Sequence, residues 1–343
     1  MKVRLLRFAH DTVISKCHCF GLCLFFMSCL FLCGGIAVAS ERITQFSLPD
    51  YQENVVGELR FVAARQSDTL SDIAKEYGLG YDLLRAANPA VDPWMPEEGE
   101  TIVLPFLFVL PDAPRVGIVV NVAEKRLYYY PPIKANELPY VEVYSVSIGR
   151  QAWSTPIGQT KVTGRAIDPA WYPPQSIRDE HMANGDPLPR VVPAGPQNPL
   201  GRHLLQLGMP GYFIHGTNKP FGIGMQVTHG CIRMYPKDIE HLVDTVANGT
   251  RVIFVNQPYK IGWKNNKLYA EVHPPLDSYA KTKNISSTPF PDNSQLLETM
   301  RGAMKKHFSQ VTHIRINQKS ATEIWRQSLG IPVEFGVLKV HDL

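Results

Sequence analysis

Apolar residues recur with a helical period between residues 61 and 105. In the first stretch they occupy positions i, i+3, i+4 and i+7, namely Leu70, Ile73, Ala74 and Tyr77. This spacing predicts a helix with one buried face. Asp68 is expected to cap its first turn, and Gly78 stands where a left-handed residue commonly ends a helix.

A second helix is predicted over residues 81–87, with apolar positions at Leu83, Leu84 and Ala87. Short apolar runs at 60–63 and 101–104 flank the two helices and predict a pair of strands. We therefore interpret residues 61–105 as a small βααβ unit.

The period changes from 3.6 to 2 further along the chain. Residues 40–60 are expected to be a polar lead-in, and residues 105–114 a proline-punctuated linker. Beyond it, apolar residues alternate or run continuously in 117–122 and 126–130, which predicts a β-hairpin, and again in 140–148, which predicts a further strand.

One helix is expected within this β-rich region. Pro236 suits its first position, Asn248-Gly249 suits its end, and the apolar positions between them are Ile239, Leu242, Val243 and Val246. Residues 115–258 are thus predicted to form a mainly β domain. Residues 259–343 carry weaker signals, with an apolar helical pattern near 296–304 and a capping box at Ser320, and are interpreted as an α/β C-terminal extension.

The first 39 residues differ from the rest. Four basic residues precede an apolar run from Cys17 to Ile36, and Ala37-Val38-Ala39 has the form cut by a signal peptidase. Residues 1–39 are therefore expected to be an export signal. The alternative is an uncleaved inner-membrane anchor, because about 20 apolar residues can span a bilayer.

Charge and cysteine content change once this segment is set aside. The remainder holds 31 basic and 30 acidic residues, a balance that argues against a nucleic-acid partner. Five of the six cysteines lie in the export segment, leaving Cys231 alone. A lone thiol outside the cytoplasm indicates either burial or chemistry.

The residues around Cys231 favour chemistry. His215, His229 and Arg233 lie close in sequence, and an imidazole or a cation can promote the thiolate that acts as nucleophile. Gly230 lets the main chain approach a substrate closely. These residues alone leave three alternatives open: a cysteine acyltransferase, an inert core thiol, or a zinc site.

The zinc alternative would use His215, His229 and Cys231 as ligands. A tetrahedral site needs a fourth ligand, and His203 is the local candidate.

The βααβ unit resembles the lysin-motif domains, which bind peptidoglycan and chitin strands. The resemblance rests on Ser67-Asp68-Thr69-Leu70, Ile73-Ala74, Tyr77-Gly78, Asn88-Pro89 and the closing Gly99 to Pro105 segment. It implies peptidoglycan glycan strands as a partner, with Trp94 available to stack on a sugar ring. We expect such a unit to act as a tether, separate from the reacting bond.

Residues 115–258 resemble the catalytic domain of the L,D-transpeptidases. The signature is His215-Gly216 followed by Thr228-His229-Gly230-Cys231-Ile232-Arg233, and matching segments also occur at 147–149, 155–158 and 192–201. The resemblance implies a β-sandwich-like catalytic fold that needs no metal or organic cofactor. It also implies peptidoglycan stem peptides as substrates and carbapenems as inhibitors.

The same resemblance implies the roles of the site residues. Cys231 would attack the carbonyl of the third stem residue, diaminopimelate, and expel D-Ala, with His215 as base. Gly216 would orient the His215 ring, and His229 and the Gly230 amide would support the site and its oxyanion hole. Thr228 and Arg233 would contribute to substrate binding, Arg233 by holding a carboxylate.

The C-terminal extension, with its motifs at 271–276 and 330–333, resembles one branch of this family. That branch transfers the acyl group either to another stem or to an outer-membrane lipoprotein, and works in the periplasm. The competing hypothesis is a wall-binding protein that has kept the fold without catalysis.

Overall fold

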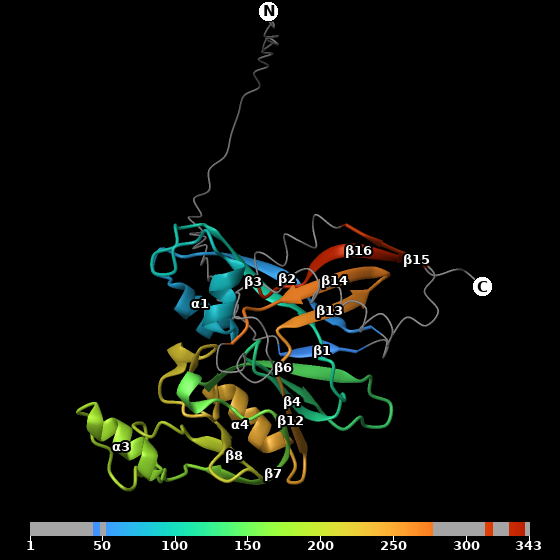
Figure 1. Cartoon of the computed structure of the whole chain (residues 1–343). Coiled ribbons are helices and arrows are strands. Elements are labelled where there is room, and N and C mark those ends of the chain that lie inside the picture. The colour runs from blue at the N-terminus through green and yellow to red at the C-terminus, as the bar shows by residue number, and fades with distance from the viewer. Residues whose placement is uncertain (1–43, 49–52, 277–312, 318–328, 340–343) are drawn as a thin grey trace, which may run out of the picture. The chain divides into compact units, whose positions relative to one another are not determined.

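A computed structural model describes residues 44–48, 53–276, 313–317 and 329–339 (Figure 1). The export signal predicted for residues 1–39 and the helices predicted near 296–304 and after Ser320 lie outside these residues. Within the described part of the chain, every helix is too short or too polar to cross a membrane.

The βααβ unit is present as predicted, with longer strands. Its elements are β2 (Val55–Ala63), α1 (Leu70–Tyr77), α2 (Tyr81–Ala87) and β3 (Thr101–Val109), and the two strands pair antiparallel along their whole length. Buried Asn88 ties the end of α2 to β3: its side-chain amide donates to the Leu84 and Val103 carbonyls at 2.8 and 2.9 Å, and its oxygen accepts from the Val103 N–H at 2.8 Å.

The cap of α1 differs from the prediction by one residue. Thr69, not Asp68, is the N-cap: its hydroxyl accepts from the Asp72 N–H, and the Asp72 carboxylate accepts from the Thr69 N–H. These two reciprocal hydrogen bonds satisfy the N–H groups of Thr69 and Asp72, which would otherwise have no partner within the helix. The Asp68 carboxylate instead accepts from the Arg65 N–H at 2.9 Å. Gly78 ends the helix at φ 71°, as expected.

Two of the predicted loop segments are strands, so those predictions were wrong. In the supposed lead-in, β1 (Gln45–Ser47) pairs with the large sheet and β2 already begins at Val55. In the supposed linker, β3 continues through Pro105 to Val109, with Phe106 and Phe108 buried. The connection between the βααβ unit and the next domain is therefore reduced to residues 110–116, between β3 and β4.

The central domain is a ten-stranded sheet, which confirms the mainly β prediction. The strand order is β1-β6-β11-β9-β8-β7-β12-β4-β5, with β10 beside β6, and a further β5–β6 pairing closes the path. The bounds are β4 (Gly117–Asn121), β5 (Arg126–Tyr130), β6 (Tyr140–Gly149), β7 (Gly158–Ile167), β8 (His203–Leu207), β9 (Phe213–His215), β10 (Gln226–Thr228), β11 (Ile232–Met234) and β12 (Arg251–Val255).

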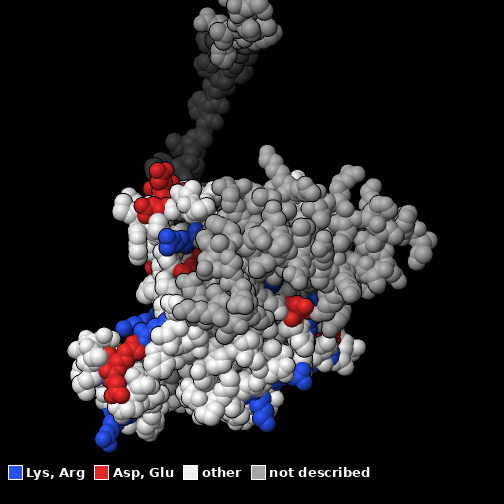
Figure 2. Space-filling model, viewed as in Figure 1, with Lys and Arg blue, Asp and Glu red and all other residues white. Residues whose placement is uncertain are grey.

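Helices complete this domain. The predicted helix is α4 (Pro236–Thr245), whose buried Ile239, Leu242 and Val243 join the core of the large sheet. Each such side chain contributes about 1.5–3 kcal/mol by leaving water. A second helix, α3 (Gln175–Ala183), was not predicted; it buries Ile177 alone. In the same view, Figure 2 shows acidic and basic side chains side by side on the segment that carries α3.

The described part of the C-terminal extension is a four-stranded sheet of order β13-β14-β16-β15. Its strands are β13 (Tyr259–Lys264), β14 (Lys267–Val272), β15 (His313–Ile316) and β16 (Val333–Lys339). It lies beside β2 and β3 in Figure 1 and contacts both strands.

A buried ionic cluster joins this extension to the rest of the protein. Arg126 pairs with Glu124 and Glu271, while Lys260 lies 2.8 Å from Glu124 and 3.0 Å from Glu271. Glu271 also accepts the Val109 N–H at 2.7 Å. Burial alone would favour the neutral acid, yet Lys260 and Arg126 hold the pKa of Glu271 well below its usual range.

His273 lies 2.8 Å from Glu271, so Glu124, Glu271 and His273 have the spacing of a metal site. Because Arg126 and Lys260 already supply two positive charges to these carboxylates, the cluster is better suited to ion pairing than to holding a cation.

Replacing Glu271 with glutamine should lower the free energy of unfolding by about 3 kcal/mol, because it leaves a buried positive charge uncompensated. Urea denaturation measures this change. The control is Glu334→Gln, which breaks the exposed Lys267–Glu334 pair of the same sheet and should cost less than about 1 kcal/mol. Equal effects of the two variants would contradict a special role for the buried cluster.

Candidate active site

Two of the predicted site residues lie on one face of two adjacent strands, and Cys231 directly precedes one of these strands. β9 and β11 run parallel, and the register sets Arg233 opposite His215 and Ile232 opposite Ile214. Residues two apart on an extended chain face the same way, so Cys231, which immediately precedes β11, shares the side occupied by Arg233 and His215. The fold thus brings together a thiol, an imidazole and a guanidinium from separate parts of the sequence.

The turn that carries Cys231 is held by two threonine hydroxyls. Thr228 donates to the Cys231 carbonyl at 2.6 Å, and Thr155 donates to the Gly230 carbonyl at 2.9 Å. Across a trans peptide the carbonyl and the following N–H point in opposite directions. The Cys231 N–H therefore points away from Thr155.

Glycine is required at position 230. Its φ is +101°, and a Cβ there would lie 2.9 Å from the Tyr212 ring. Side chains other than hydrogen are strained in this left-handed region.

His215 is buried and has a fixed tautomer. Its Nδ1 lies 2.7 Å from the Gly216 carbonyl, which can only accept, so Nδ1 carries the proton and Nε2 holds the lone pair. Burial, with help from the Arg233 charge, lowers the pKa of His215 to about 4. The imidazole is therefore neutral at pH 7 and able to accept a proton.

Cys231 is half-buried, and its Sγ donates to the Gly211 carbonyl at 3.6 Å. Burial raises the pKa of the thiol to about 11, against the opposing effects of the Phe213 N–H and Arg233. With these pKa values, a neutral thiol and a neutral imidazole are the expected forms at pH 7.

Arg233 lies opposite His215 in the strand register, and its positive charge acts on both His215 and Cys231. Its Nε is buried without a hydrogen-bond partner, and among the described residues no carboxylate forms an ion pair with it. Burial lowers the pKa of Arg233, which still leaves the group charged at pH 7. The site therefore presents a partly desolvated cation that an incoming anion would neutralise.

His229 faces a different set of residues. β10 ends at Thr228 and Gly230 has a φ of +101°, so the chain is not extended between His229 and Cys231. Its Nε2 lies 2.8 Å from Arg150 and 3.4 Å from Glu180, and its ring meets that of Trp153 edge-on at 5.2 Å. Burial and the Arg150 charge lower the pKa of His229.

Arg150 and Glu180 were missed by the sequence analysis. Arg150 follows directly after the 147–149 motif, and that position was the one available signal. Glu180 comes from the unpredicted helix α3; it pairs with Arg150 and accepts from the Trp153 indole N–H at 3.1 Å.

The geometry does not assemble the zinc ligands considered above. His203 precedes Leu204, which pairs with His215, so the His203 side chain points to the opposite face of the sheet. With His229 turned toward Arg150 and Glu180, the ligand set is dispersed.

Comparison with known proteins agrees with the resemblance of the βααβ unit and with that of the catalytic domain. Residues 115–254 match the L,D-transpeptidase catalytic domain, and residues 65–105 match the LysM domain. A probable L,D-transpeptidase YcfS from Escherichia coli K12 is 42% identical over 271 residues, which cover 77% of this chain and 80% of that protein. A probable L,D-transpeptidase ErfK/SrfK from Salmonella typhimurium is 38% identical over 293 residues, covering 84% and 90%.

Proposed function

The chain belongs to the L,D-transpeptidase family, and from this premise we propose that it is a cysteine acyltransferase that remodels peptidoglycan stem peptides. The observation that carries the proposal is the register of β9 and β11, which sets Arg233 opposite His215, with Cys231 directly before β11. The LysM match implies peptidoglycan binding by the N-terminal unit.

In the proposed reaction, Cys231 attacks the carbonyl of the third stem residue, diaminopimelate. The thiol proton passes to the lone pair on His215 Nε2 as the sulfur–carbon bond forms. His215 then returns the proton to the nitrogen of the departing D-Ala, which leaves a thioester on Cys231. An acceptor amine attacks the thioester, His215 takes the amine proton, and the thiol is restored.

The resting charges favour proton transfer during attack rather than before it. With the pKa of His215 near 4 and that of Cys231 near 11, a prior ion pair is unfavourable in the free site. The negative charge that develops on the substrate oxygen needs N–H donors. We assign this role to the Gly230 and Cys231 amides, which is supported by the direction that Thr155 imposes on the Cys231 N–H.

Arg233 is proposed to bind a carboxylate of the stem peptide through its planar fork. Arg233→Ala should lower kcat/KM on the order of tenfold to a hundredfold, with KM carrying most of the loss, because one charge-assisted interaction disappears. Arg202→Ala, which removes an exposed pair with Asp168, serves as the control. Substrates in which one carboxylate at a time is amidated test this assignment. If Arg233→Ala lowers kcat/KM equally for every amidated substrate, Arg233 does not recognise a carboxylate.

The remaining features set the place of action and the acceptor. Exposed Trp94 and Phe61 offer aromatic surface to glycan rings, which supports wall binding by the βααβ unit. The apolar segment within residues 1–39 supports export to the periplasm. The acceptor is proposed to be an amine of a second stem or of an outer-membrane lipoprotein, and product masses distinguish the two.

The test uses the full chain with a disaccharide tetrapeptide and, separately, with a carbapenem. Mass analysis should find D-Ala release, cross-linked dimers and one carbapenem adduct on Cys231. A protein that binds sacculi yet gives neither adduct nor D-Ala would instead be a non-catalytic wall-binding protein.

A further inference from the structure

The turn between α1 and α2 of the LysM domain contacts the catalytic segment at two points. The Tyr81 N–H donates to the Ile223 carbonyl at 3.0 Å, and the Tyr235 hydroxyl donates to the Leu79 carbonyl at 2.9 Å. The residues between Ile223 and Tyr235 include Thr228, His229, Gly230, Cys231 and Arg233. One short turn therefore holds both ends of the segment that carries the nucleophile.

Between these two hydrogen bonds the main chains touch directly. A Cβ added to Gly224 would lie 2.3 Å from the Gly80 Cα, and one added to Gly80 would lie 3.0 Å from the Gly224 Cα. Gly224 also has a φ of +88°, whereas Gly80 is in ordinary extended conformation at φ −77°. The approach is one that two glycines allow and a side chain at either position would disturb.

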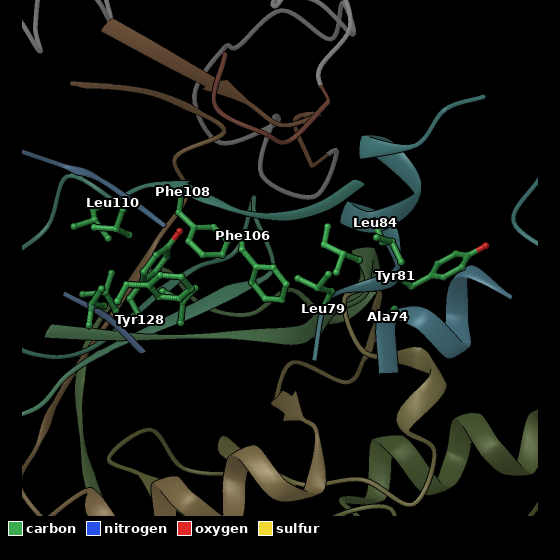
Figure 3. Close-up of a cluster of buried hydrophobic side chains, with 14 of the residues drawn as sticks. Ala74, Leu79, Tyr81, Leu84, Phe106, Phe108, Leu110 and Tyr128 are labelled. Atoms are coloured by element: carbon green, nitrogen blue, oxygen red, sulfur yellow. The ribbon is translucent and has the colours of Figure 1, made fainter. Parts of the chain in front are cut away.

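The contact is continuous with a shared hydrophobic core. Leu79 and Leu84 of the LysM domain and Phe106 of β3 pack in one cluster with Tyr128 of the large sheet (Figure 3). Val143 of the large sheet belongs to the same cluster. A small cavity of ≈ 10 Å³, about the room that one water molecule needs, lies at this boundary beside Leu79, Phe106 and Val143. Such packing gives the turn a fixed position relative to the sheet.

A displacement of the turn would reach Cys231 through a short series of contacts. Ser147 donates to the Gly222 carbonyl at 2.6 Å, and β10 pairs with β6 immediately after Gly224. At the end of β10, Thr228 donates to the Cys231 carbonyl. From the other side, Tyr235 follows Arg233 by two residues.

We propose that the Leu79–Tyr81 turn positions the acyl-transfer site, so that the wall-binding domain is also part of the catalytic frame. This inference rests on the proposed function. It replaces the expectation that the domain acts only as a tether.

Two substitutions test the proposal in the full chain. A misplacement of about 1 Å can cost on the order of a hundredfold in rate. Gly80→Ala should therefore lower the rate constant of Cys231 acylation by roughly tenfold to a hundredfold. Tyr235→Phe, which removes only the hydroxyl bound to Leu79, should lower it by about threefold to tenfold. KM for the stem peptide and pull-down by sacculi should stay near the wild-type values in both.

The matched control is Tyr129→Phe, because Tyr129 of β5 donates to the Thr245 carbonyl of α4 at 3.3 Å and has no part in the contact. It should leave the acylation rate unchanged at a similar cost in stability. Equal losses in Tyr129→Phe and Tyr235→Phe, or wild-type acylation by a folded Gly80→Ala protein, would overturn the proposal.

Alkylation of Cys231 by a neutral reagent separates this proposal from the proposed function. If the wild type acylates no stem peptide, the proposed function fails. In that case, comparing the alkylation rates of the variants with that of the wild type still shows whether the turn positions the thiol. Unchanged alkylation–pH profiles in Gly80→Ala and Tyr235→Phe would again contradict the inference.

Discussion

Replacing Cys231 with alanine is expected to abolish the covalent adduct with carbapenems and to lower D-Ala release on the order of a thousandfold or more. Sulfur supplies the bond that holds the acyl group, and Cys231 is the one cysteine of the described residues. Single-turnover mass analysis measures both reactions.

Cys231→Ser is the informative companion variant. It keeps the shape of the turn, but a hydroxyl gives up its proton far less readily than a thiol, so this variant should be nearly as slow. Both variants should retain the thermal stability and sacculus binding of the wild type. Turnover of the tetrapeptide stem by Cys231→Ala at a rate near that of the wild type would remove Cys231 as nucleophile.

Replacing His215 with alanine should slow acylation on the order of a hundredfold to ten-thousandfold, the usual contribution of a general base. His229→Ala should cost less than about tenfold, since His229 faces Arg150 and Glu180. The two variants form a matched pair, because each removes one partly or fully buried imidazole from the same region.

The pH dependence of Cys231 alkylation distinguishes the two histidines. In the wild type, base-assisted attack requires neutral His215, so its rate should stay level above pH 4 and fall as pH drops through that value. Direct attack by the thiolate should add to it as pH rises toward the thiol pKa of about 11. His215→Ala should lose the level region and keep the alkaline rise. Loss of the level region in His229→Ala instead would show that the roles are reversed.

Local signals predicted the elements whose stability is decided locally. The helices at 70–77 and 81–87 and the hairpin of β4 and β5 follow from periodicity and turn residues that a short window contains. The cap of α1 was misassigned because Asp68 and Thr69 are both suitable residues, and Asp72, three residues after Thr69, decides between them.

The prediction of a linker at residues 105–114 was wrong because of the role given to Pro105. Pro105 was taken as a break, but β3 pairs only with β2, and a strand with an open edge tolerates a residue without an N–H. Sequence pattern could not reveal that the neighbouring Phe106 and Phe108 have the large sheet to pack against.

The residues of the candidate site also fall into two groups: those that a sequence pattern reveals and those that only the fold brings together. Cys231, His215 and Arg233 belong to one two-part sequence signature, so the sequence suffices to single them out. Their approach to one another depends on the parallel pairing of β9 and β11. Glu180 gave no signal because α3 buries one apolar side chain and has almost no hydrophobic period. Its contact with His229 exists only in the folded protein.

The buried ionic cluster also has a consequence for folding, because its members come from distant parts of the sequence. Arg126 and its partner Glu271 are separated by 145 residues, and Lys260 depends on the same carboxylate. A chain cut short before β14 would have to bury both cations without that carboxylate, which is unfavourable. We therefore expect a chain that ends before β14 to be less stable around Arg126, and to be cleaved by proteases more readily than the full chain.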